Sequence, residues 1–239
     1  MSPRGVIEFP RFRDLGPERI NRDFQIHTVW TDGQATVEEV LHRAVEIGLG
    51  ELAFTEHARA TSNYYSAFFG EVDAAVRASG EPRVWRGFEI KAVDTAGALD
   101  MTGEMRAAAD LVLGSVHSLP LDGRWVPARE LPHADAVERE FALACGIADS
   151  SEADVLAHAG GMALRAHGDF PDEYLGELMR RCRGSGVAFE INASYHEPIL
   201  ERLLGLLEQH DPPVSIGSDA HRLDEVGRCR DILRARFGW

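Results

Sequence analysis

Eight side chains with metal-binding chemistry stand at or just after the ends of short apolar runs in this 239-residue sequence. In chain order they are His27, Asp32, His57, Glu89, His117, His158, Asp219 and His221. Imidazole and carboxylate are the ligands that borderline and harder divalent ions prefer. One such residue alone indicates a structural histidine or a turn, but recurrence at nearly every run predicts one shared metal site. A carboxylate such as Glu89 also suits a site with several ions, because its two oxygens can each hold a cation.

The elements that must position these residues alternate between strands and helices. Apolar and β-branched runs predict seven strands, at residues 24–27, 51–54, 84–89, 111–116, 155–157, 187–191 and 214–216. Amphipathic patterns predict helices at 36–47, 65–79, 136–148, 172–183, 197–209 and 224–236. The first of these carries a capping box, Thr36 with Glu39, and a stop at Gly48. This alternation predicts a single α/β domain, a closed or nearly closed parallel barrel with its functional residues at the strands' C-terminal ends.

Composition limits the classes of partner. The formal charge is −14, from 39 acidic and 25 basic residues, which disfavours long nucleic acid and leaves a small phosphorylated substrate compatible. Cys145, Cys182 and Cys229 form no CxxC pair, which indicates free thiols in a reducing cytoplasm and argues against a cysteine-type zinc site. No apolar run has the length of a membrane span, and the sequence does not indicate an oligomeric state.

The ordered motifs QIH, TEH, GFEIK, SVHS, LAHAG, EINAS and SDAH resemble those of the PHP (polymerase and histidinol phosphatase) family of metal-dependent phosphoesterases. The resemblance implies a distorted (β/α)7 barrel over residues 23–239, after an N-terminal extension of residues 1–22. It also implies up to three divalent ions per chain, zinc, manganese or iron. Carried over, it places the first ion on His27, Glu89 and Asp219, the second on Glu89, His117 and His158, and the third on Asp32, His57 and His221.

The sequence departs from the family pattern at Gln25, where many members carry histidine in an H-x-H motif. An amide oxygen is neutral and is a poorer zinc ligand than imidazole. The first ion is therefore expected to be held with lower occupancy and affinity, with a preference shifted toward manganese or iron. The PHP domains of bacterial family-X DNA polymerases resemble this sequence in carrying glutamine there, so the substitution is compatible with an active enzyme.

On this resemblance we expect a phosphatase that hydrolyses a small phosphomonoester with a metal-activated water. Arg59 and Lys91 are the cations nearest the predicted mouth and are expected to bind the phosphate and serve catalysis, while Asn192 is expected to orient the substrate. The competing interpretations are exposed ion pairs for the cations and a loop cap for the asparagine. Two other functions stay open, a barrel amidohydrolase acting on a C–N bond and a non-catalytic metal-binding or ligand-sensing barrel.

Two segments and two histidines are further candidates for contact with a substrate. The aromatic residues 61–69 could form a stacking wall, although packing on the core explains them as well. Residues 119–132 form a long segment that could act as a lid over the site. His167 and His196 follow the fifth and sixth predicted strands.

Overall fold

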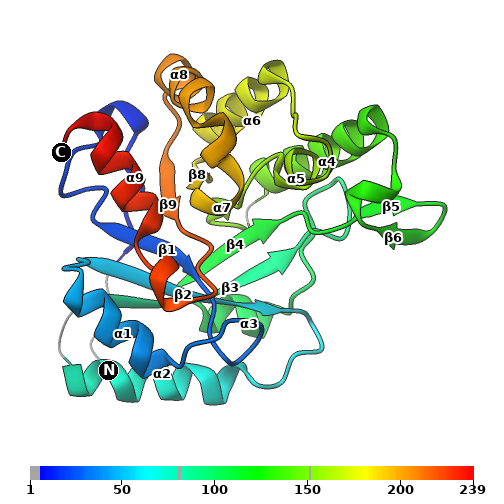
Figure 1. The fold of residues 1–239 in the computed structure, drawn as a ribbon. Coiled ribbons are helices and arrows are strands. Elements are labelled where there is room, and N and C mark those ends of the chain that lie inside the picture. The colour runs from blue at the N-terminus through cyan, green and yellow to red at the C-terminus, as the bar shows by residue number, and fades with distance from the viewer. Residues whose placement is uncertain (1–5, 80–81, 151) are drawn as a thin grey trace.

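Seven parallel strands form a nearly closed barrel in the computed structural model, which describes residues 6–79, 82–150 and 152–239 (Figure 1). Each strand pairs with the next in the order β1 (Arg22–Ile26), β2 (Glu51–Ala58), β3 (Arg83–Lys91), β4 (Leu111–Ser115), β7 (Val155–Leu156), β8 (Ala188–Asn192) and β9 (Val214–Gly217). The barrel closes between β1 and β9 through a bridge of two hydrogen bonds at Ala220. His27 N–H donates to the Ala220 carbonyl at 2.9 Å, and Ala220 N–H donates to the Gln25 carbonyl at 3.1 Å. The predicted strands are all present, and the predicted barrel class is confirmed.

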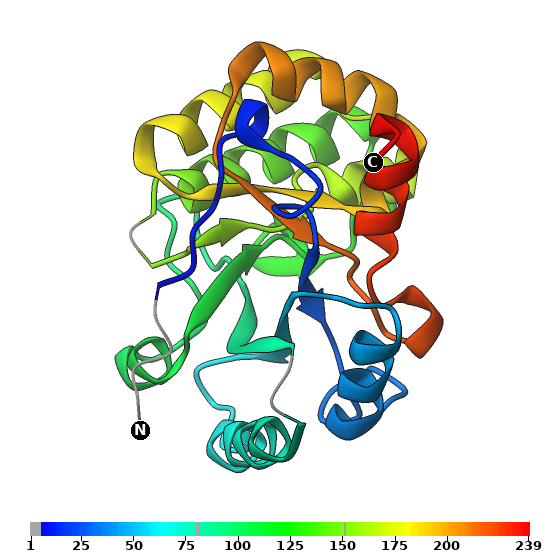
Figure 2. The ribbon, with the colours of Figure 1, turned by 90° about the vertical axis from the view of Figure 1, so that its left-hand side faces the viewer.

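Helices cover the outside of the barrel. They are α1 (Val37–Glu46), α2 (Tyr65–Ser79), α3 (Gly103–Ala108), α4 (His133–Ala148), α5 (Gly161–His167), α6 (Asp172–Ser185), α7 (Ala193–His196), α8 (Leu200–His210) and α9 (Arg228–Phe237), with 3₁₀ turns at Phe12–Asp14, Ala128–Glu130, Glu197–Ile199 and Leu223–Glu225. Figure 2 shows α1 and α2 on one side of the strands and α4, α6 and α8 on the other. The capping box of α1 is confirmed, since the Thr36 hydroxyl accepts from Glu39 N–H and Thr36 N–H donates to the Glu39 carboxylate.

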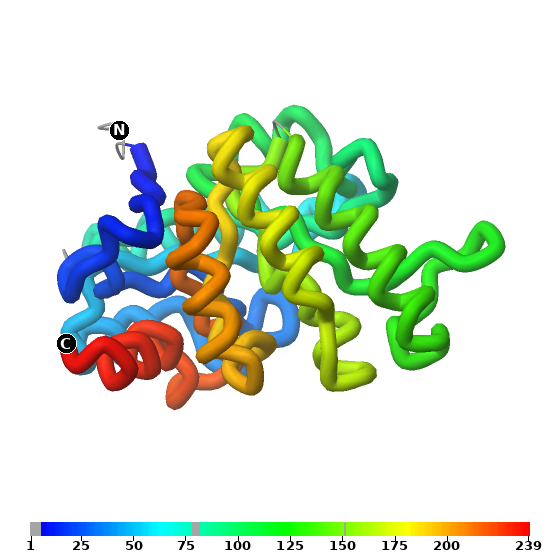
Figure 3. The backbone as a smooth tube through the Cα atoms, turned by 90° about the horizontal axis from the view of Figure 1, so that it is seen from above, coloured from blue at the N-terminus to red at the C-terminus, as the bar shows by residue number. Residues whose placement is uncertain are grey.

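Three features of the fold were not predicted from the sequence. Helices α3 and α5 are too short to show a helical period. Within the expected lid at 119–132, the chain forms an antiparallel hairpin of β5 (Leu119–Leu121) and β6 (Arg124–Val126). Figures 1 and 3 both show this hairpin projecting from the body beside α4. The last predicted helix is divided by Gly227, whose φ of 78° separates a 3₁₀ turn from α9.

The barrel interior changes from apolar to polar along the strands. Because alternate residues of a strand point to the same side, Ala53, Thr55 and His57 of β2 share its inward face. Ala53 belongs to an apolar cluster at the N-terminal half of the barrel, with Trp85 of β3 among its members. The larger apolar cluster lies between strands and helices. The apolar cluster that contains Ala53 and Trp85 therefore fills the N-terminal half of the barrel. The polar residues lie at the C-terminal ends of the strands, where the functional site was predicted.

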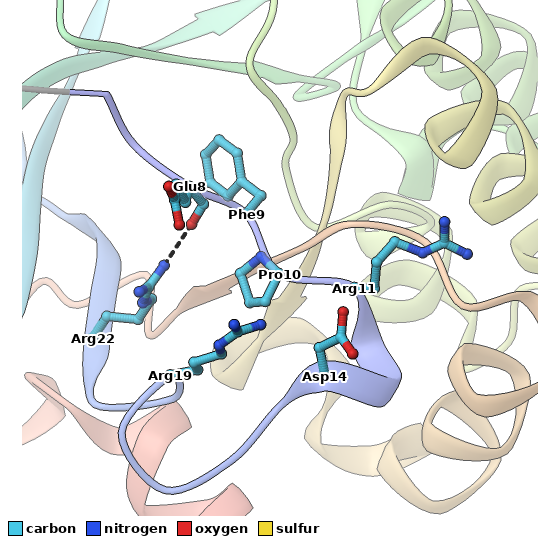
Figure 4. Close-up of a pocket in the computed structure, with 7 residues that line it drawn as sticks. All are labelled: Glu8, Phe9, Pro10, Arg11, Asp14, Arg19 and Arg22. Atoms are coloured by element: carbon cyan, nitrogen blue, oxygen red, sulfur yellow. Dashed lines mark hydrogen bonds between the residues drawn. The ribbon is translucent and has the colours of Figure 1, made fainter.

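The N-terminal segment packs against the opposite end of the barrel. Pro10 accepts a hydrogen bond from Val214 N–H at 2.9 Å, and Arg11 pairs with Asp211 at 2.6 Å. A hollow of about 520 Å³ lies at this end, and Figure 4 draws the residues that line it. Among them, Arg22 donates to the Glu8 carbonyl at 2.8 Å. Residues 1–5 of the predicted extension lie outside the described residues. Within the described ranges, the structure has no helix with the length and apolar character needed to cross a membrane.

Candidate metal centre

The eight side chains predicted to bind metal converge at the C-terminal ends of the strands. His27 and Asp32 follow β1, His57 lies on β2, Glu89 lies on β3, His117 follows β4, His158 follows β7, and Asp219 and His221 follow β9. A parallel barrel directs all of these strand ends to one mouth, which explains how residues far apart in the sequence meet.

Glu89 is the centre of the cluster and is 2% exposed. Its Oε1 lies 2.8 Å from Nε2 of both His117 and His158. Its Oε2 lies 3.4 Å from Nε2 of His27 and 3.2 Å from Nδ1 of His57. Each carboxylate oxygen thus faces a different pair of imidazoles, the arrangement that a carboxylate bridging two cations requires.

Three groups of ligand atoms lie close enough to share an ion. His27, Glu89 and Asp219 form one such group, and Asp32, His57 and His221 form another that His27 also joins. In the third group, His57 stands with Glu89 and His117, while His158 contacts the same Glu89 oxygen as His117. Two of the groups contain the sets that the family resemblance implied for the first and third ions, whereas the third group has His57 in the place of His158. The ligation of metal by these residues stays a prediction.

The chemistry of the cluster fits bound cations. Both ring nitrogens of His27 and the Oε2 of Glu89 are buried without a hydrogen-bond partner. A buried polar atom left unpaired costs about 1–3 kcal/mol, so three in one place indicate that a partner of another kind belongs there. Burial alone would raise the pKa of Glu89, but the imidazoles of His117, His158 and His27 outweigh it and hold that pKa well below its usual range. A divalent ion would stabilise the same charged form.

Backbone strain is concentrated at two of these residues. His158 has a φ of 30° and Asp219 a φ of 53°, both in the left-handed region that non-glycine residues seldom occupy. His158 is held there by its N–H, which donates to Glu190 Oε2 at 2.7 Å. The carbonyl of Asp219 lies 2.9 Å from Nδ1 of His221. The surrounding contacts therefore fix two side chains in directions that ordinary strand geometry does not give.

Two buried carboxylates outside the cluster anchor the loops that carry it. Glu56 accepts from the N–H of Thr28 at 2.8 Å and from its hydroxyl at 2.6 Å, which fixes the loop after β1. Asp23 accepts from Ser218 N–H and Gly227 N–H, both at 2.8 Å, which fixes the loop after β9. Burial raises the pKa of Asp23 to about 6. Neither role was predicted, although Glu56 is part of the TEH motif.

A cavity of about 400 Å³ opens over the cluster. Its lining residues are Asp32, His57, Glu89, His117, His158, Arg165, Ser194, Tyr195, Asp219, His221 and Glu225. Arg165 of α5 is its cation, and its guanidinium carbon lies 3.8 Å from the ring centroid of Tyr195. Among the described residues no carboxylate forms an ion pair with Arg165, so its donors are available to a ligand. Sequence reasoning missed Arg165 because α5 was not predicted.

The three residues expected to bind substrate lie elsewhere. The lining of the cavity includes neither Arg59 nor Lys91, and Lys91 Nζ lies 4.6 Å from the ring centroid of Trp125 in the hairpin. Asn192 is buried, and its Oδ1 accepts from the N–H groups of Ser194 and Tyr195. The structure therefore supports the loop-cap interpretation of Asn192, and the roles of the two cations stay predictions.

The turn between β7 and α5 is held by buried side chains from neighbouring helices. His196 Nε2 donates to the Ala159 carbonyl at 3.0 Å, and burial lowers the pKa of His196 to about 4, which keeps the ring neutral. Glu140 of α4 accepts from Met162 N–H at 3.0 Å and from Ala163 N–H at 2.7 Å, at the start of α5. These contacts position both the ligand candidate before the turn and the arginine after it.

The other candidates for substrate contact pack against the protein itself. Phe68 lies edge-on to Phe54 with ring centroids 6.5 Å apart, and Phe69 stacks on Phe88 at 5.0 Å. The aromatic stretch 61–69 therefore contributes to the core. His167 Nε2 lies 3.2 Å from the Ala128 carbonyl, and His167 is not among the cavity's lining residues.

Known proteins with similar sequences include polymerases and phosphatases. The DNA polymerase/3'-5' exonuclease PolX of Bacillus subtilis is 24% identical over 231 residues, which cover 92% of this chain and 38% of PolX. This chain thus spans about two fifths of that relative's length. A probable phosphatase of Acetivibrio thermocellus is 24% identical over 248 residues, which cover 90% of this chain and 98% of the relative.

Solved structures and a family model agree on the fold. The putative histidinol phosphatase of Listeria monocytogenes matches 87% of this chain and 97% of its own with a TM-score of 0.71 at 16% identity. The histidinol phosphate phosphatase of Lactococcus lactis, complexed with zinc, L-histidinol and phosphate, matches 88% of this chain and 92% of its own with a TM-score of 0.66 at 15% identity. The PHP domain family model matches residues 23–194. With that match over most of its length and the barrel that supports it, the chain belongs to the PHP domain family.

Proposed function

We propose that this protein is a metal-dependent phosphoesterase, a phosphatase that hydrolyses a small phosphomonoester. The observation that carries the proposal is the convergence of five histidines and three carboxylates, with four of the histidines around Glu89. The cluster lies under a cavity whose arginine, Arg165, forms no ion pair among the described residues. The probable phosphatase that aligns over 98% of its own length supports it. The zinc and phosphate in the histidinol phosphate phosphatase of similar fold support it as well.

The residues divide into those that would hold cations and those that would hold the substrate. Up to three divalent ions, zinc, manganese or iron, would supply Lewis acidity that neutralises the phosphate charge and activates water near neutral pH. Arg165 can donate two parallel N–H groups to phosphate oxygens, and the ring of Tyr195 beneath it limits the directions the guanidinium can take. A cavity of about 400 Å³ is at the small end of the range for ligand sites, which favours a small substrate.

The test is phosphate release by the full chain, first stripped of metal by a chelator and then supplied with manganese, zinc or iron. The substrate panel contains p-nitrophenyl phosphate, histidinol phosphate, mononucleotides and other phosphorylated metabolites. We expect metal-dependent release that falls more than about 100-fold in Glu89→Gln, because even outer partners of metal ligands contribute 10–100-fold. Glu138→Gln, an exposed position on α4, is the matched control.

The same panel separates the two other functions. Cleavage of amides without release of phosphate would favour a barrel amidohydrolase. Fewer than two tightly bound ions per chain, with no ester hydrolysed, would favour a metal-binding or sensing barrel. Full phosphatase activity in the chelated protein, or in Glu89→Gln, would contradict the proposal.

A further inference from the structure

The side chain of Asn192 has a fixed orientation. Its Oδ1 accepts two hydrogen bonds, from Ser194 N–H at 2.9 Å and Tyr195 N–H at 3.1 Å, which cap the start of α7. Its Nδ2 donates two, to Gln25 Oε1 at 2.8 Å and to Glu190 Oε2 at 3.1 Å. All four hydrogen-bonding positions of this buried amide are therefore used, and turning it over would lose every one.

The orientation of Asn192 decides the orientation of Gln25. Both side chains are at most 1% exposed, and the 2.8 Å between Asn192 Nδ2 and Gln25 Oε1 is a direct hydrogen bond. If Gln25 turned its oxygen away, its NH₂ group would face the NH₂ group of Asn192, and two donors would meet without an acceptor. The oxygen of Gln25 thus faces Asn192 and accepts its hydrogen bond, and its Nε2 has no hydrogen-bond partner among the described residues.

Gln25 nevertheless lies close in the chain to a predicted ligand of the first ion. It is on β1, two residues before His27, which directly follows the strand. Alternate residues of an extended chain face the same side. A Cβ added to Gly217, two residues before Asp219, would lie 3.1 Å from the Cβ of Gln25 and 2.0 Å from Glu190 Oε1. Gly217 therefore leaves the space in which the side chains of Gln25 and Glu190 lie, one layer below the cluster.

We propose that Gln25 is not a metal ligand but a hydrogen-bonding strut between β1 and β8, so that His27, Glu89 and Asp219 alone supply the protein ligands of the first ion. An amide nitrogen has no free lone pair for a cation, and the hydrogen bond from Asn192 uses one of the two lone pairs of the Gln25 oxygen and holds that oxygen toward β8. The side chain of Gln25 is therefore a poor substitute for the family's histidine. The inference rests on the proposed metal-dependent function and specifies one position within its site.

The first experiment measures bound metal rather than catalysis. Wild type, Gln25→Met, Gln209→Met and Asp219→Asn are loaded with manganese, zinc or cobalt, and the ions per chain and their dissociation constants are measured by elemental analysis and chelator competition. Methionine keeps the length of glutamine but removes both polar atoms, and exposed Gln209 of α8 is the matched control. We expect Gln25→Met to keep the wild-type number of ions and each dissociation constant within threefold, while Asp219→Asn loses an ion or weakens one more than tenfold. The visible spectrum of cobalt-loaded Gln25→Met should also match that of wild type.

The second experiment needs no variant and therefore does not depend on the folding of Gln25→Met. A crystal of manganese-loaded wild type, measured for anomalous scattering, should place an ion against His27, Glu89 and Asp219 and none within coordination distance, about 2.0–2.2 Å, of Gln25 Oε1. An ion on that oxygen, or loss of an ion in Gln25→Met but not in Gln209→Met, would overturn this inference and leave the phosphatase proposal standing. Wild type that binds no ion in any condition would overturn both.

Discussion

The substitution Glu140→Gln tests whether burial or hydrogen bonding controls the charge of the carboxylate that anchors α5. Glu140 is 1% exposed, and no cationic side chain forms an ion pair with it among the described residues. Burial favours the protonated form, whereas the N–H groups of Met162 and Ala163 favour the charged form. Burial is the larger effect and raises the pKa of Glu140 from 4.5 to about 7.

The stability consequence follows from the direction of that shift. An acid whose pKa is higher in the folded than in the unfolded protein binds its proton more tightly when folded. Its contribution to stability is therefore fully present below pH 4.5 and is lost as the pH rises to about 7. At about 1.4 kcal/mol for each pH unit, the loss amounts to about 3 kcal/mol over this range. Glutamine cannot ionise, so Glu140→Gln avoids this loss.

Glutamine introduces a separate cost that does not depend on pH. Its NH₂ group must face one of the two N–H donors at the start of α5, which costs about 1–3 kcal/mol. At pH 4.5 we therefore expect Glu140→Gln to be less stable than wild type. The difference should move in favour of Glu140→Gln by about 3 kcal/mol by pH 8 and approach or cross zero.

The assay is urea unfolding of the metal-free protein between pH 4.5 and 8, for wild type, Glu140→Gln and the exposed control Glu138→Gln. Comparing variants at each pH removes the titration of the histidine cluster, which they share. A difference that does not change with pH would show that the carboxylate has an ordinary pKa in the fold. A difference that grows against Glu140→Gln as the pH rises would show that the N–H donors outweigh burial, and would refute the reasoning.

Three further changes have defined outcomes. Arg165→Lys should raise KM for a phosphomonoester about tenfold, through loss of a bidentate contact worth about 1.4 kcal/mol, while Lys91→Ala changes it less than threefold in the same steady-state assay. Gly217→Ala should destabilise the fold by about 1–3 kcal/mol in urea unfolding, because its Cβ would lie 2.0 Å from Glu190 Oε1. Thr36→Ala should cost about 1 kcal/mol by the same measurement and leave phosphatase activity unchanged, since it removes only the cap of α1.

The candidate metal ligands could be predicted because their positions in the fold depend mainly on where the strands end. Apolar runs locate the strands, and parallel topology brings the ends together, so a histidine such as His117 is placed without any knowledge of helix packing. The extra bend that brings His158 and Asp219 into the cluster requires a left-handed backbone, which the sequence does not reveal. The cluster was therefore predictable as a set of residues, but its distances were not.

The cation that lines the cavity was harder to predict, because proximity in sequence is a poor guide beyond the strand ends. Lys91 shares the inward direction of Glu89, two residues earlier, but it stands further along β3, where the hairpin brings Trp125 against it. Arg165 lies in the cavity because the turn after β7, with Gly160 at a φ of 79°, leads directly into α5 beside Tyr195. The packing of the short helix α5 therefore decides that Arg165, and not Lys91, lines the cavity.

Gln25 shows how a distant contact can decide what a residue in a motif does. From the QIH motif alone, the side-chain oxygen of Gln25 would be interpreted as a weak replacement for a histidine ligand. In the fold, Asn192, 167 positions away, already uses that oxygen, because the cap of α7 leaves the NH₂ group of Asn192 facing β1. A hydrogen bond between two buried amides is stronger than one exposed to water, because the interior has a low dielectric constant. On the proposed role of Gln25, the ligands of the first ion would depend on a helix cap at the end of β8. Glutamine at this position would then indicate a different ligand set rather than a weakened one.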